Sequence, residues 1–178
     1  MARTSRTDDE VRAASDHLYY EIQMLQGTMA ILATAATGQS ILSNALIESF
    51  TIHARVLMHF LYPTGSIQPS DVLAEDFFDD VGHWLAIRPD EPAVFRTARG
   101  RVNKEIAHLT YDRQLITPEL KGWNFVALGN EILKIVQIFV SAIPQQLLGL
   151  RWQQIDAECE NDTSMAPSQV AEKYKADG

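Results

Sequence analysis

The sequence predicts an all-α protein, a bundle of four to five helices. Apolar residues recur every three or four positions through four long segments, which is the spacing of one helix face. No stretch of the sequence alternates apolar and polar residues with a period of two, and no Asn-Gly hairpin signal is present. We therefore expect helices near residues 8–36, 40–62, 92–113 and 118–143.

The first two predicted helices have recognisable ends. The carboxylates of residues 8–10 lie in the first turn of the first helix, where they favour the positive end of the helix dipole. Gly38 follows its last turn as a typical C-terminal residue. The second helix begins at about Ser40 and stops at Pro63, which cannot continue it.

The second helix carries a first group of candidate residues. His53 falls in the middle of its apolar stripe, where a satisfied core histidine is the expected role. The functional alternative is that His53 or Arg55 faces the polar flank of the third long helix. Glu48 and Arg55 are seven residues apart and share a neighbouring face with His59.

Residues 63–92 are the least regular part. A short helix is expected from Ser70 to Phe78, and a further helical turn around Trp84. The carboxylate run on and after the short helix lacks the alternating ligands and central glycine of a calcium loop, so a solvated acidic face is expected. Its members are Asp71, Glu75, Asp76, Asp79 and Asp80. A histidine-based metal enzyme is the less favoured alternative, because no histidine pair has the four-residue spacing of a helical zinc site. The histidines it would use are His53, His59, His83 and His108. We expect no metal and no cofactor.

The stretch from Arg99 to Arg113 concentrates basic side chains, an imidazole and a phenol on the third helix. Arg101 and His108 are two turns apart and lie within roughly 20° of each other around the axis. An arginine in this position can bind a phosphate while the imidazole transfers a proton. The alternative is an ordinary surface helix with solvated charges. Gly100 indicates a bend or a close approach to the backbone. The apolar stripe of this helix is Phe95, Ala98, Val102, Ile106 and Leu109.

The fourth helix is predicted to begin with Thr117 as its N-cap and Pro118 at its first position, and to stop before Pro144. A short helix carrying Trp152 is expected at about residues 147–155. One domain should span residues 8–157, with a flexible N-terminus at 1–7 and a polar, disordered tail at 158–178.

Composition limits the function classes. The net charge of −8 disfavours a protein that coats nucleic acid, although residues 88–113 hold six basic and four acidic side chains, a local balance of +2. Cys159 is the single cysteine, which excludes a disulfide framework within one chain. We expect no signal peptide, no membrane span and a cytoplasmic, bacterial-style protein.

Arg101 and His108, separated by six residues on the third long helix of a small bundle, make the chain resemble the HEPN superfamily. The resemblance covers roughly residues 8–145. Two positions depart from the family pattern. Val102 follows the arginine where a polar residue is usual, and Tyr111 lies three rather than two residues beyond the histidine.

The resemblance implies a metal-independent endoribonuclease of toxin or phage-defence type, with its cleft formed where two copies pair. Arg101 and His108 would be catalytic, and Asn103 and Tyr111 candidate helpers. A homodimer is then expected, with RNA and an antitoxin as candidate partners. The competing hypothesis is a non-catalytic helical module that dimerises or binds another protein, which suits the acidic surface.

Overall fold

The computed structural model describes residues 5–34, 40–102, 111 and 122–152, and every regular element in these ranges is helical. The all-α prediction is confirmed. The elements are α1 (Asp8–Thr34), α2 (Ile41–Leu61), the 3-10 helix η1 (Ala74–Phe77), α3 (Val81–Ile87), α4 (Ala93–Arg101), α5 (Phe125–Ala142) and the 3-10 helix η4 (Gln145–Leu147).

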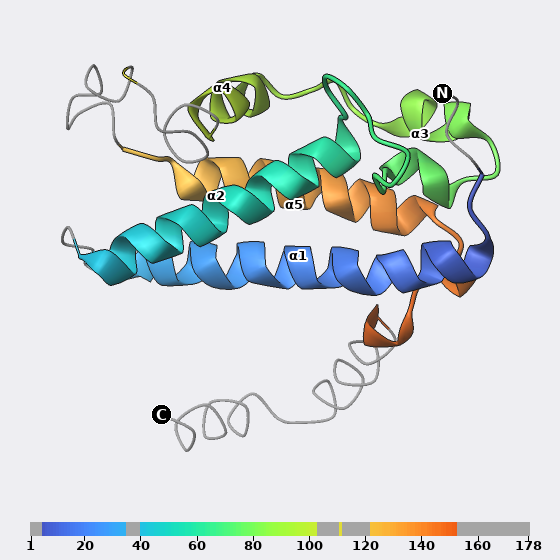
Figure 1. Cartoon of the computed structure of the whole chain (residues 1–178), viewed down its shortest axis with the longest axis horizontal. Helices are drawn as coiled ribbons and strands as arrows, with labels where there is room; N and C mark the ends of the chain where they lie inside the picture. The colour runs from blue at the N-terminus through green and yellow to red at the C-terminus, as the bar shows by residue number, and fades with distance from the viewer. Residues whose placement is uncertain (1–4, 35–39, 103–110, 112–121, 153–178) are drawn as a thin grey trace.

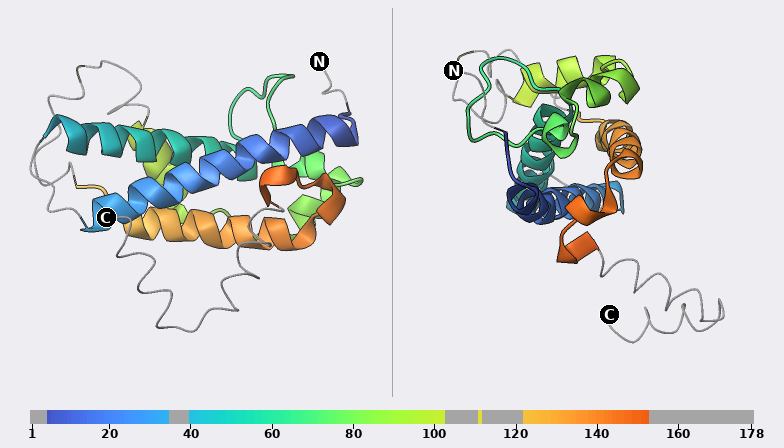
Figure 2. Two further views of the ribbon diagram at one scale, coloured as in Figure 1. Left: turned by 90° about the horizontal axis from the view of Figure 1, so that it is seen from below. Right: turned by 90° about the vertical axis from the view of Figure 1, so that its right-hand side faces the viewer.

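Three long helices, α1, α2 and α5, pack side by side and enclose the core (Figures 1 and 2). Their apolar stripes face one another, with Leu25, Leu57 and Ile132 fully buried. Helix α4 lies on the side of α2 and α5 away from α1 (Figure 1). The bundle therefore forms as the sequence periodicity predicts.

The first helix begins with reciprocal hydrogen bonds between Thr7 and Glu10. The Glu10 carboxylate accepts from the Thr7 N–H (2.9 Å), and the Thr7 hydroxyl oxygen accepts from the Glu10 N–H (3.3 Å). The hydrogen bonds from the Thr7 N–H and hydroxyl hold the pKa of Glu10 below its usual value. In α2, the Ser40 hydroxyl accepts from the Ser43 N–H, which confirms the predicted start of that helix.

The prediction of one continuous helix over 118–143 is wrong. Residues 122–124 are not helical, and α5 begins at Phe125 with Asn124 as its N-cap. The Asn124 side-chain oxygen accepts from the Ala127 N–H (3.0 Å). Gly122 is a poor helix former and asparagine is a strong cap, so a helix starts here. The predicted Thr117 cap lies outside the described residues, whereas the predicted end before Pro144 is confirmed.

The short helix expected from Ser70 also starts later, at Ala74. The Asp71 carboxylate accepts from the Gln68 N–H (2.8 Å), which closes a turn instead of capping a helix. Asp76 then accepts from the Leu73 N–H and fixes the start of η1. The helical turn expected around Trp84 is confirmed as α3.

The segment after α5 returns to α1. The Gly149 N–H donates to the Ser15 hydroxyl (2.7 Å), and the Trp152 indole N–H donates to the Ser15 carbonyl (2.9 Å). Residues 150–152 are helical, as expected for the segment carrying Trp152, whose remainder lies outside the described residues. The expected tail at 158–178 and the first four residues lie outside them as well.

Helix α5 is the one helix in the described ranges that is long and apolar enough to cross a membrane, by length and composition only. Its residues Leu128, Ile132, Ile135 and Phe139 are buried inside the bundle. A core helix passes the same test, so this helix is weak evidence for a membrane span.

Aromatic rings surround Phe139 and join α2, η1 and α3 to α5. The ring of Phe139 meets those of Phe60 (5.0 Å), Phe77 (5.3 Å) and Trp84 (5.6 Å) edge to face. Such pairs add about 0.5–1.5 kcal/mol each to the free energy of burial. The irregular segment after α2 is held to the core through this cluster.

Phe139→Ala should lower the free energy of unfolding by about 3–5 kcal/mol, because it leaves a cavity among fixed rings. Ile52→Ala is the control, since Ile52 is 52% exposed and its truncation should change stability by less than about 1 kcal/mol. Urea denaturation of both variants measures the difference. Equal losses would show that the ring cluster does not stabilise the fold.

Candidate functional site

Arg101 lies in the last turn of α4, beside a stripe that is buried as predicted at Phe95, Ala98 and Val102. Its guanidinium stacks over the Trp123 ring at 4.1 Å and donates to the Gly122 carbonyl (3.0 Å). Helix α4 is thereby joined to the start of α5.

Two of the predicted site residues, Asn103 and His108, lie outside the described residues. The convergence of Arg101 and His108 therefore stays a prediction. Tyr111 is described and is 90% exposed. At Gly100 no described residue lies within 4 Å of the position that a Cβ would take, so the described part of the chain makes no close approach to its backbone.

His53 is a buried core residue, as its place on the apolar stripe predicts. Its Nδ1 lies 2.7 Å from Glu21 Oε2, and its ring meets that of Tyr20 edge to face at 5.7 Å. These partners belong to α1, so of the two residues in the functional alternative it is Arg55, not His53, that lines a pocket together with Arg99 of α4. Glu48 is exposed on α2 and does not line the pocket described next.

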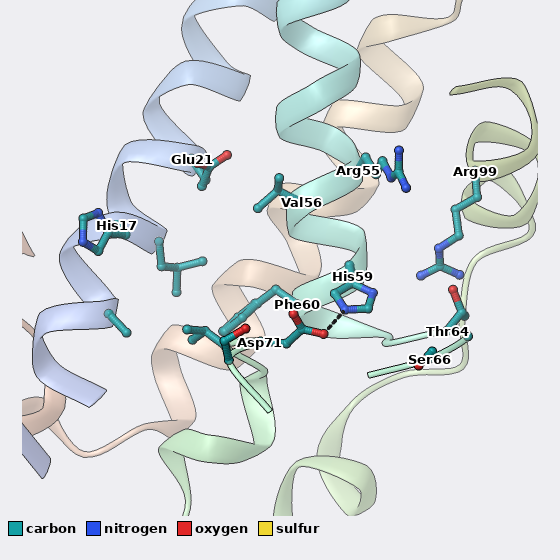
Figure 3. Close-up of a pocket in the computed structure, with 15 residues that line it drawn as sticks. His17, Glu21, Arg55, Val56, His59, Phe60, Thr64, Ser66, Asp71 and Arg99 are labelled. Atoms are coloured by element: carbon teal, nitrogen blue, oxygen red, sulfur yellow. Dashed lines mark hydrogen bonds and ion pairs between the residues drawn. The ribbon is translucent and has the colours of Figure 1, made fainter. Parts of the chain in front are cut away.

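A pocket of about 780 Å³ lies along α2, between α1 on one side and Arg99 of α4 on the other (Figure 3). Arg55, Val56 and His59 share the face of α2 that borders it, since they are three and four residues apart. The segment after α2 closes one end with Thr64 and Asp71. The lining residues are Ala14, His17, Leu18, Glu21, Arg55, Val56, His59, Phe60, Thr64, Gly65, Ser66, Ser70, Asp71, Val72 and Arg99.

The charged groups of the pocket are unevenly distributed. Figure 3 shows Arg55 and Arg99 on one side, with Glu21 and His17 of α1 on the other. Within the described part of the chain, Arg55 is exposed and makes no hydrogen bond or ion pair. One side of the pocket therefore presents a guanidinium that can bind an anion.

His59 lies next to this guanidinium on α2 and is oriented by a carboxylate. Its Nε2 lies 3.4 Å from Asp71 Oδ2, and Asp71 is itself held by the Gln68 N–H. His59 therefore adds a ring nitrogen that can donate or accept a hydrogen bond to this wall of the pocket. No group of three or more metal-ligating side chains occurs among the described residues.

Arg99 forms the far wall of the pocket and is tied to the end of α2. It donates to the carbonyls of Met58 (3.0 Å) and Tyr62 (2.6 Å), and it pairs with the Glu91 carboxylate. Its side chain is 17% exposed. Arg99 is thus a structural residue that also lines the pocket, with its charge paired to Glu91.

The sequence predicts part of this site. The helical spacing places Arg55 and His59 on one face of α2, but no sequence pattern indicates Arg99, Asp71 or His17 as pocket residues. These three belong to different elements, and only the folded chain brings them together. Their side chains follow no common spacing that would have indicated a shared pocket.

No protein-family model matches the chain, and neither a curated protein nor a solved structure matches it. The resemblance to the HEPN superfamily therefore rests on the residues of the sequence alone.

Arg99→Met should lower the free energy of unfolding by about 2–3 kcal/mol, because it removes a charged donor from the Met58 and Tyr62 carbonyls together with the part-buried ion pair to Glu91. Arg96→Met is the matched control: Arg96 also lies on α4 near Glu91, at 3.9 Å, but is 64% exposed. A surface pair of this kind contributes at most about 1 kcal/mol. Thermal or urea unfolding compares them, and an equal effect would contradict the structural role of Arg99.

Proposed function

We propose that the protein is a metal-independent endoribonuclease of HEPN type, acting in the cytoplasm as a toxin or in phage defence. The observation that carries the proposal is the sequence pair Arg101 and His108, separated by six residues in a stretch whose spacing predicts a helix. The burial of Phe95, Ala98 and Val102 supports it, because it leaves Arg101 at the edge of the buried stripe.

The chemistry requires no cofactor. The 2′-hydroxyl of RNA attacks the adjacent phosphorus, the bond to the 5′-oxygen breaks, and a cyclic phosphate and a free 5′-hydroxyl result. His108 would pass the proton between these oxygens, and Arg101 would stabilise the charge that develops on the phosphate. Two copies would pair to complete the cleft, and an antitoxin would be the natural protein partner.

His108→Ala and Arg101→Ala should each lower the rate of RNA cleavage, by about 10²–10³-fold for Arg101 as for other donors to a developing oxyanion. Arg96→Ala is the matched arginine control on the same helix and should cleave at the parent rate. A chelator should leave the rate unchanged. Cleavage is followed on labelled RNA with purified protein. The proposal fails if the parent cleaves no RNA, or if both active-site variants cleave as the parent does.

A second candidate function is a non-catalytic dimerisation module, favoured by exposed apolar side chains at the start of α2. Ile41 is 91% exposed and Leu42 is 70% exposed, although large aliphatic side chains are usually buried. Ile31 of α1 and Val126 of α5 are also about half exposed, at 49% and 45%. Surfaces of this kind often mark a contact with another chain.

Ile41→Glu combined with Leu42→Glu should convert a dimer to a monomer, because the carboxylates would be buried against the second copy. The same substitutions suit the first turn of α2, where negative charge favours the helix dipole, so the fold should persist. Ile52→Glu, at a separate exposed apolar position of α2, is the control. Sedimentation velocity at tens of micromolar measures the mass. A monomeric parent, or a double variant that stays dimeric, would contradict this interface.

A further inference from the structure

The pocket beside α2 combines an anion-binding end with an end that accepts hydrogen bonds. Arg55 supplies a guanidinium without a partner in the described chain, whereas Arg99 lines the far wall with its charge paired to Glu91. Glu21 and Asp71 also line the pocket, and their oxygens can accept hydrogen bonds. A ligand that fits must carry an anionic group together with hydroxyl or amino donors.

The space between these polar groups is bounded by apolar side chains. Leu18 of α1 and Val56 and Phe60 of α2 line it, and a planar ring system can pack against such a wall. The volume of about 780 Å³ lies within the range of roughly 300–1,000 Å³ that is usual for small-molecule sites. A single phosphate ion would leave most of this pocket unfilled.

We propose that this pocket binds a nucleotide, with its phosphate on Arg55 and its base or ribose between the apolar wall and the carboxylates. Arg55 is the residue that contacts the phosphate, since Arg99 is held by two carbonyls and Glu91. The Thr64 and Ser66 hydroxyls line the same pocket and can donate further hydrogen bonds. The ligand is either a free mononucleotide or one unit of an RNA strand, because both present the same groups.

The site does not depend on the proposed nuclease chemistry. Arg101 does not line the pocket and stacks on Trp123 instead, and His108 lies outside the described residues. A parent that cleaves no RNA but binds a nucleotide would leave this inference standing while the nuclease proposal fails.

Isothermal titration calorimetry with AMP, adenosine, inorganic phosphate and a short single-stranded RNA tests the proposal. AMP or the RNA should bind more tightly than adenosine or phosphate. Only these two ligands occupy both the anion-binding end of the pocket and the end that accepts hydrogen bonds. Arg55→Gln should weaken that binding about tenfold or more, the usual effect of losing a charged hydrogen bond. Lys134→Gln removes the same charge from the exposed face of α5 and should change affinity by less than twofold.

Proton NMR of the imidazoles locates the ligand. His17 and His59 line the pocket and should shift on titration, whereas His83, which stacks on Phe78, should not. AMP binding identifies a free nucleotide as the ligand, and RNA binding without AMP binding identifies a strand. The proposal is overturned if neither binds at millimolar concentration, if adenosine binds as tightly as AMP, or if the Arg55 and Lys134 variants lose equal affinity.

Discussion

The C-terminal end of α2 imposes the constraint on which the arrangement of the smaller elements depends. The last carbonyls of a helix have no partner within it and must find donors elsewhere. Here the Met58 carbonyl accepts from the Tyr62 N–H (2.9 Å), and the further donors come from distant residues. Arg99 reaches the Met58 and Tyr62 carbonyls, while the Trp84 indole (3.1 Å) and Arg88 (3.2 Å) share the Leu61 carbonyl. Two of the donors are cations, which the negative end of the helix dipole favours. These bonds fix α3 and α4 against α2.

This arrangement separates the roles of the two arginines at the pocket. Arg99 is neutralised by Glu91 and held by backbone oxygens, so moving it would leave several polar groups without partners. Arg55 extends from a rigid helix and has no such ties in the described chain. Nearby, the Tyr62 hydroxyl donates to the Pro89 carbonyl (2.8 Å), and burial raises the pKa of this phenol. The end of α2 therefore fixes Arg99 in the pocket wall, while the Arg55 side chain can bind a ligand.

The long helices could be predicted because each carries its own signal. A stripe of apolar residues and a cap such as Ser40 are local properties, and α1 and α2 follow them closely. The start of α5 could not be predicted because the sequence offers two good helix starts. Thr117 and Pro118 form an N-cap pattern as strong as that of Asn124, the N-cap in the structure. The pocket could not be predicted from the sequence. It forms because a turn brings Asp71 to His59 and because Arg99 donates to carbonyls at the end of α2, and neither contact follows a periodic sequence pattern. His53 was identified as a core residue, but its carboxylate partner lies on another helix.

The three described arginines of α4 show how one short helix can serve different purposes. Arg96 is mostly exposed, Arg99 closes the end of α2, and Arg101 stacks on Trp123. A guanidinium over an aromatic ring at an exposed site gains about 0.5–1 kcal/mol, whereas a hydrogen bond to a charged group contributes about 1.5–3 kcal/mol. Arg101 already donates a hydrogen bond of the second kind to the Gly122 carbonyl, so this bond contributes more than the stacking to holding its guanidinium at the start of α5. In the proposed nuclease, a guanidinium oriented in this way would lose less entropy when a phosphate binds.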